Sequence, residues 1–266
     1  MSSTTVTKSR FRRMPALHLV QRNLLVYRHT WMVIFSGFFE PLFYLLAVGY
    51  GVGSIIGKLP VGGGRMVEYA AFVAPAMLAT SCVNGAITDG FFNPFFKLHY
   101  QGTYDGILAT PMSVSDIAKG EVIWALIRGS LYSVGFLLIL LPLGLIKSPW
   151  GIVALPAAIF VSACFSSAAI LLMTFAKKID DFDKVMNLLI HPMFLFSTTF
   201  FPLSVYPVPI RAVVFLLPLY HGIALLRGLT LGLIGWPLLG HFAYLAALAG
   251  ISLKIATSRL EKKLIK

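Results

Sequence analysis

Long apolar stretches alternate with short polar breaks along the whole chain. Six of these stretches are long enough to cross a bilayer, which takes roughly 20 mostly apolar residues in a helix. They cover residues 31–52, 69–87, 121–141, 150–175, 185–201 and 234–256. The pattern therefore predicts an all-α polytopic membrane protein, with six transmembrane helices in a domain over residues 31–256.

Three further kinds of element are expected outside the six spans. Residues 14–30 place apolar side chains on one side of a helical wheel and basic ones on another, which predicts an amphipathic interface helix. A soluble amphipathic helix packed on a partner is the alternative. The polar stretch 88–118 is too charged to span but includes a short helix over 103–109. Prolines interrupt the apolar pieces in 202–233, which predicts extracellular re-entrant or interfacial helices there.

Composition agrees with a membrane protein. Apolar residues make up 58% of the 266 and charged residues 12%, whereas soluble domains average about 45–50% and about 25%. Six spans leave no room for a second soluble domain, so an ATPase domain in the same chain is excluded. The two cysteines, Cys82 and Cys164, fall inside apolar stretches and are interpreted as small buried side chains.

The net charge of +12 is concentrated near the two ends of the chain. Lys and Arg favour the cytoplasmic side of membrane proteins, and their distribution here puts both termini in the cytoplasm. Residues 1–30 are then a cytoplasmic basic tail with the interface helix, and residues 257–266 a second cytoplasmic basic tail. We expect these charges to meet anionic membrane lipid and not nucleic acid, in a multi-pass protein of the cell membrane.

Charged side chains inside the spans are candidates for function, because each costs roughly 2.5–3.5 kcal/mol at the bilayer centre. Glu40 lies in the first span beside Pro41 and either lines a polar cavity or pairs with a basic residue on another helix. Glu121 and Arg128 are about two turns apart and share one face of the third span. An ion pair that fixes helix packing and a polar strip along a pathway both remain open for them.

Aromatic side chains are dense in the first span, and the other candidate chemistry is sparse. The aromatic residues are Phe38, Phe39, Phe43 and Tyr44. Lipid contact or packing explains such a group, and contact with an amphipathic substrate is the functional alternative. The sequence contains no Walker-type phosphate-binding loop, metal-spaced His/Cys set or assembled Ser/His/Asp arrangement. We therefore expect no catalytic site, metal or cofactor in this chain.

Three stretches resemble a known family. They are QGTYDGILATPMSVSDIAKGEVIWALIRGSL at 101–131, PMFLFSTTFFPLSVYPVPIRAVVFLLPLYHGIALLRGL at 192–229, and EPLFYLLAVGYGVG at 40–53. Together they resemble the permeases of type-2 ABC exporters. The resemblance is greatest to the branch with the nodulation lipo-oligosaccharide export permease and the actinobacterial drug-resistance permeases, and it covers nearly the whole chain in the same order.

The resemblance implies partners and a docking element. The ATPase is a separate ATP-binding subunit that binds ATP and Mg²⁺, and the permease forms a homodimer or a heterodimer with a similar chain. A short cytoplasmic coupling helix between spans two and three docks on the ATPase. The residues that match it here are Gly102, Thr103, Tyr104, Asp105, Gly106, Ile107, Leu108 and Ala109. Tyr104, Ile107 and Leu108 share one helical face, which we expect to be exposed for the partner.

The function implied is export of a lipid-linked, glycolipid or amphipathic drug-like substrate from the cytoplasm or inner leaflet. The alternative is an ATPase-independent secondary carrier or channel, in which Glu40, Glu121 and Arg128 relay protons or ions. Such carriers often contain inverted repeats, and the sequence shows no such internal symmetry. A membrane-embedded enzyme is a third class, and it is disfavoured because no catalytic set can be assembled.

Overall fold

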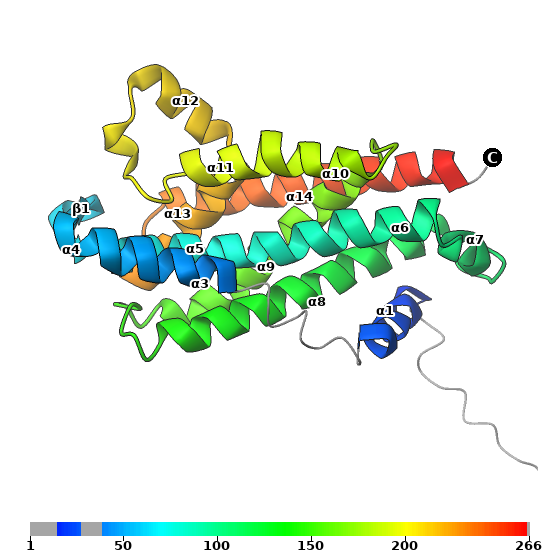
Figure 1. Ribbon diagram of the computed structural model, residues 1–266, viewed down its shortest axis with the longest axis horizontal. Coiled ribbons are helices and arrows are strands. Elements are labelled where there is room, and N and C mark those ends of the chain that lie inside the picture. The colour runs from blue at the N-terminus through cyan, green and yellow to red at the C-terminus, as the bar shows by residue number, and fades with distance from the viewer. Residues whose placement is uncertain (1–14, 28–38, 265–266) are drawn as a thin grey trace, which may run out of the picture.

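Helices that lie lengthwise beside one another form an elongated bundle (Figure 1). The computed structural model describes residues 15–27 and 39–264. The elements in chain order are α1 (Pro15–Tyr27), α3 (Phe39–Tyr44), η2 (Leu45–Val52), α4 (Gly53–Ile56), β1 (Lys58–Val61), η3 (Gly62–Gly64), β2 (Arg65–Glu68), α5 (Tyr69–Ile87), η4 (Thr88–Phe92), α6 (Asn93–His99), α7 (Thr103–Leu108), α8 (Val114–Leu140), α9 (Gly151–Met173), α10 (Asp180–Val185), η5 (Met186–Ile190), α11 (His191–Phe196), η6 (Leu203–Val205), α12 (Val208–Leu216), α13 (Pro218–Leu231) and α14 (Pro237–Leu264).

Five helices in the described residues are long and apolar enough to cross a membrane. Consecutive helical elements are counted as one, and the five cover 39–56, 69–99, 114–140, 151–173 and 237–264. A sixth crossing is possible through α12 and α13, which are bent by 87° relative to each other. The helix formed by α10, η5 and α11 lies along the bundle but ends at Phe196, short of the predicted 201. The polytopic helical fold is confirmed with five to six spans; residues 31–38 of the predicted first span lie outside the described part.

Several predicted boundaries are wrong, each for a local reason. The second helix continues through η4 and α6 to His99, into the stretch predicted to be too charged to span, because its charged residues are paired inside the bundle. The third helix begins at Val114, where Ser113 and Asp116 form a capping box. The helix α14 extends through the predicted tail to Leu264. The helix α13 has 14 residues, longer than the predicted short pieces.

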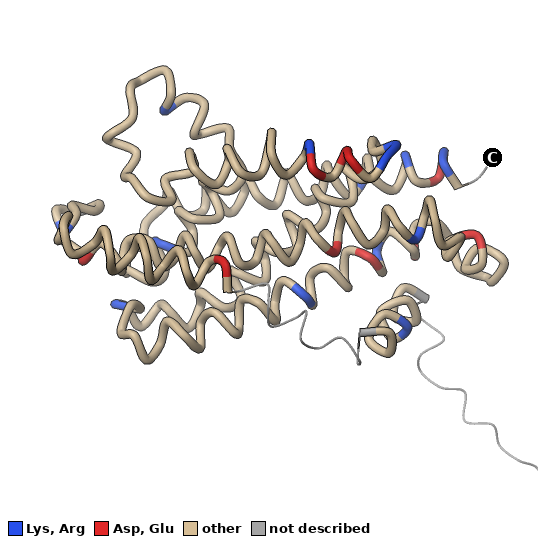
Figure 2. Tube along the Cα trace, in the orientation of Figure 1, with Lys and Arg blue, Asp and Glu red and all other residues tan. Residues whose placement is uncertain are grey.

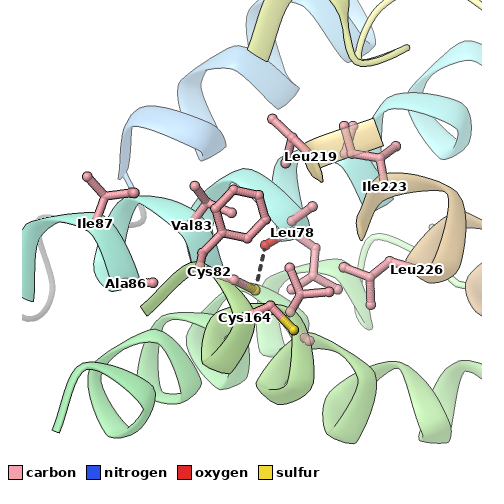
Figure 3. Close-up of a cluster of buried hydrophobic side chains, with 14 of the residues drawn as sticks. Leu78, Cys82, Val83, Ala86, Ile87, Cys164, Leu219, Ile223 and Leu226 are labelled. Atoms are coloured by element: carbon pink, nitrogen blue, oxygen red, sulfur yellow. Dashed lines mark hydrogen bonds between the residues drawn. The ribbon is translucent and has the colours of Figure 1, made fainter. Parts of the chain in front are cut away.

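The core of the bundle is built around α5, which packs against α8, α9 and α13. In the apolar stretch of the helix 69–99, 94% of the residues are buried. Close approach depends on small residues: a Cβ on Gly129 of α8 would lie 1.8 Å from Ser162 Oγ on α9. Figure 3 shows Cys82 and Cys164 in this apolar cluster, with Cys82 Sγ donating a hydrogen bond to the carbonyl oxygen of Leu78. Both cysteines are buried as predicted.

The two ends of the bundle differ in structure and in charge. One end carries the antiparallel β1–β2 hairpin, in which Lys58 lies opposite Glu68 in the strand register. We call it the hairpin end. The other carries α7 and the C-terminal end of α14, with α1 packed on α8, and is called the α7 end. Figure 2 shows that charged positions are more frequent toward the α7 end.

Candidate functional site

Two buried ion pairs connect the helix 69–99 to α8. Lys97 Nζ lies 2.8 Å from Glu121 Oε1, and Arg128 Nε lies 2.9 Å from Asp89 Oδ2. All four side chains are at most 9% exposed. Buried charges need compensation, either from an opposite charge or from hydrogen bonds to backbone carbonyls. The structure therefore places Glu121 and Arg128 in interhelical ion pairs, which was one of the two interpretations left open. Their partners, Lys97 and Asp89, come from the stretch 88–118, which was predicted to be polar and too charged to span.

Glu121 is the centre of a polar cluster that joins four elements. The hydroxyl of Tyr104 on α7 donates to Glu121 Oε1 at 3.0 Å, and Lys97 Nζ on α6 also donates to Asn23 Oδ1 on α1 at 3.2 Å. We call Asn23, Lys97, Tyr104 and Glu121 the Glu121 cluster. Burial, followed by the charge of Glu121, raises the pKa of Tyr104 well above its ordinary value. The phenol therefore stays protonated and remains a hydrogen-bond donor.

The apolar face of α7 is turned into the protein, contrary to expectation. Tyr104 is 1% exposed and forms a small core with Leu19 of α1 and Ile117 of α8, against which Ile107 and Leu108 are partly buried. The prediction that this face is exposed for a partner is wrong, because α1 packs at the α7 end and covers it. The residues of the α7 segment that remain exposed are Gly102, Asp105, Gly106 and Ala109, with Thr103 half-buried.

A cavity of about 260 Å³ between the helices brings Glu40 and Arg128 to one space. Polar groups of Asn84, Tyr132 and His191 line it together with apolar side chains from α5, η5, α11 and α13. Asn84 Nδ2 donates to Glu40 Oε2 at 3.4 Å, and Arg128 Nη2 donates to the hydroxyl of Tyr132 at 2.9 Å. The cavity is thus amphipathic, and Glu121 does not line it.

The aromatic residues of the first span have different surroundings. Phe39 and Phe43 are 43% and 61% exposed, and their ring centroids are 6.0 Å apart. Tyr44 packs edge-on against Phe194 of α11 at 5.5 Å. Phe38 lies outside the described residues. The two phenylalanines suit contact with lipid, whereas Tyr44 packs against the helix that also lines the Glu40 cavity.

The apolar helices indicate a multi-pass membrane protein, and comparison with known proteins indicates that it is a transport permease. The family model for ABC-2 type transporters matches residues 16–231. Nodulation protein J of Rhizobium meliloti (strain 1021) is 29% identical over 249 residues, which cover 92% of each chain. Inner membrane transport permease YadH of Escherichia coli (strain K12) is 26% identical over 205 residues, covering 76% of this chain and 77% of the relative.

The chain belongs to the ABC-2 type transporter family. It is a multi-pass membrane permease, and membership implies that it works with an ABC ATP-binding subunit. The family resemblance drawn from the sequence is confirmed.

Proposed function

We propose that this chain is the permease of an ATP-driven exporter that moves an amphipathic substrate out of the cytoplasm or inner leaflet. A lipid-linked molecule, a glycolipid or an amphipathic drug-like compound fits this class. ATP and Mg²⁺ bind to the partner subunit, and two permease chains, identical or similar, form the pathway. The charge distribution supports a cytoplasmic α7 end, and the amphipathic Glu40 cavity supports a substrate that has polar and apolar parts.

The observation that carries this proposal is the buried hydrogen bond from the Tyr104 hydroxyl to Glu121. The helix α7 has only 6 residues and ends at Leu108. The next helix, α8, is capped by Ser113, five residues further along the chain. Besides the apolar contacts of its buried face, α7 is connected to the spans through the Glu121 cluster, which contacts α8 through Glu121 and α6 through Lys97. A push on α7 by the ATP-binding subunit is therefore transferred to both antiparallel helices at once, because Glu121 is held by Lys97 and Tyr104 together.

The proposal separates the residues that dock the partner from those that transmit its motion. The exposed residues Asp105 and Ala109 are the docking candidates, because they face outward from α7. Tyr104 is buried and is the transmission candidate. Replacing Tyr104 by a charged residue would undock α7 from the bundle, so the milder Tyr104→Phe substitution is the informative one.

The experiment uses the permease and its ATP-binding subunit reconstituted together in vesicles. Tyr104→Phe should still capture the ATP-binding subunit and support ATP hydrolysis, but transport per ATP should fall several-fold. The variant Asp105→Lys/Ala109→Lys should lose capture itself. Tyr50→Phe, on an exposed tyrosine of η2, controls for the loss of a hydroxyl group.

Transport per ATP that is unchanged in Tyr104→Phe would refute transmission through the Glu121 cluster. Capture that is unchanged in the double lysine variant would refute docking on the exposed side of α7. Transport by the permease without any ATP-binding subunit would instead indicate an autonomous carrier.

A further inference from the structure

A second cavity, of about 560 Å³, lies at the hairpin end of the bundle. Its walls come from the β1 region, α5, the segment 198–204, α13 and α14. Most of the lining is apolar and includes Phe72, Leu203 and Leu238, while a few polar side chains converge on the same space. These polar side chains are Thr198, Ser204, Tyr220, Arg227 and His241.

Arg227 is a buried cation in the wall of this cavity. It is 8% exposed, and its Nε donates to the carbonyl of Phe72 at 3.1 Å. Nη1 and Nη2 donate to Thr198 Oγ1 at 3.3 Å and to the carbonyl of Thr198 at 2.8 Å. The ring of Phe72 lies 3.8 Å below the guanidinium carbon. Every one of these partners is neutral, and together they use three of the five N–H donors of the guanidinium.

The other buried cations of the bundle, unlike Arg227, each have a carboxylate partner. Lys97 and Arg128 each lie within 2.9 Å of a carboxylate. In the part of the chain that the structure describes, no ion pair involves Arg227. Carbonyl oxygens and an aromatic face orient the guanidinium, but they do not neutralise its charge, and an uncompensated buried charge is costly. An anion in the adjoining cavity would supply the missing charge.

A histidine pair borders the same cavity through His241. His221 Nε2 lies 2.9 Å from the carbonyl oxygen of Phe215, which can only accept, so Nε2 carries the proton. The Nδ1 atoms of His221 and His241 are 2.8 Å apart and share one proton between them. In the neutral pair that proton belongs to His241, whose Nε2 is therefore an acceptor. The neutral pair therefore adds polar surface to the cavity wall but no charge, so the cation of this cavity is Arg227.

We propose that this cavity binds an anionic amphiphile. Its phosphate or carboxylate group lies against Arg227, and its apolar part lies along Phe72, Leu203 and Leu238. The site is separate from the Glu40 cavity, with which it shares no lining residue. The inference does not depend on the proposed transport function, because binding is measured on the purified permease without an ATP-binding subunit.

The experiment measures binding of short-chain phosphatidylglycerol to the full chain in a non-ionic detergent, by native mass spectrometry. Phosphatidylcholine with the same acyl chains is the zwitterionic comparison. Arg227→Met removes the charge and keeps most of the volume. Arg65→Gln is the matched control, because Arg65 lies at the same end, is exposed, and does not line the cavity.

We expect phosphatidylglycerol to bind the wild type and Arg65→Gln equally, and Arg227→Met at least tenfold more weakly. Phosphatidylcholine should bind all three weakly and alike. Displacement of the lipid by millimolar inorganic phosphate would support a site for the anionic group alone. Failure of phosphate to displace it would support a site that also needs the apolar part. Equal affinity of Arg227→Met and wild type for phosphatidylglycerol, or equal binding of the two lipids to the wild type, would overturn the proposal.

A second pair of variants covers the case in which Arg227→Met does not fold. Ser204 is exposed in a short helical turn and lines the cavity, so a new side chain there is tolerated. Ser204→Asp places a carboxylate in the wall, whereas Ser204→Asn has the same size without charge. A tenfold loss of phosphatidylglycerol binding in Ser204→Asp alone supports the anion site. Wild-type affinity in both variants overturns it.

Discussion

The buried pair between Lys97 and Glu121 should contribute far more to stability than an exposed pair of the same length. The perturbations are Lys97→Met, Glu121→Gln and the two combined. Both single changes keep the approximate size of the side chain and remove one charge. Each leaves the opposite charge in place, in a site where the two partners are 9% and 2% exposed.

The contacts set the magnitude. Glu121 accepts two bonds from Lys97, at 2.8 and 2.9 Å, and one from Tyr104 at 3.0 Å. Breaking a buried pair by removing one partner costs about 3–5 kcal/mol, because the other charge stays desolvated. Once one charge is gone, removing the second costs little. We therefore expect the double variant to be no less stable than either single variant, and the coupling energy to be roughly 3 kcal/mol, at the upper end of measured interactions between contacting residues.

The assay is equilibrium unfolding of the full chain in mixed micelles with an increasing fraction of denaturing detergent, followed by tryptophan fluorescence. Trp124 on α8 is 2% exposed and lies one turn from Glu121, so it reports on this region. The matched control is Lys184→Met. Lys184 pairs with Asp181 at 2.7 Å, but the two side chains are 66% and 27% exposed, and such surface pairs contribute little.

Two results would refute the reasoning. If Lys97→Met and Lys184→Met changed the free energy of unfolding equally, burial would not decide what the pair contributes. If the two single substitutions at Lys97 and Glu121 were additive in the double variant, the two charges would not depend on each other.

The remaining predictions concern packing, the inner cavity and topology. Gly129→Ala should lower the free energy of unfolding by about 1–3 kcal/mol, because its Cβ would overlap a serine on α9, whereas Gly250→Ala, with no atom within 4 Å of the new Cβ, should be tolerated in the same unfolding assay. Glu40→Gln should reduce transport in vesicles with little loss of folded protein; failure to accumulate would show that the carboxylate serves packing. A single cysteine at Lys147 should react with an impermeant thiol reagent from outside the cell and one at Lys178 should not; labelling of both would overturn the proposed orientation.

The long apolar stretches predicted the membrane class and most helices, because a helix that crosses the bilayer must consist of about 20 mostly apolar residues. This pattern failed where polar residues continue a helix. Asp89, Asn93 and Lys97 follow one another at intervals of four and so share one face of the helix 69–99. The signal was present, but the segment was interpreted as a polar stretch too charged to span. Asp89 and Lys97 are eight residues apart on this helix, and their partners Arg128 and Glu121 are seven residues apart on α8. The partners follow in reversed order along the chain, which is typical of antiparallel helices.

The burial of Tyr104 could not be predicted from the sequence. The spacing of Tyr104, Ile107 and Leu108 shows that they share a face, but not whether that face contacts the bundle or another chain. The positions of α1 and α8, which supply Leu19 and Ile117 to this small core, decide the question. The same holds for Arg227, whose cavity is assembled from five separate segments.

The enclosure of α5 has a consequence for how the gene can vary. In the apolar stretch of its helix 94% of the residues are buried, whereas in α14 only 11% are. A helix with lipid on one side tolerates almost any apolar residue there, so its mutational tolerance rises and falls every 3.6 positions. The helix α5 has no such side, since α8, α9 and α13 all pack against it. A saturation scan should therefore find α5 intolerant of larger residues around its whole circumference and α14 permissive along a stripe, so that the central helix drifts slowest while the outer ones diverge.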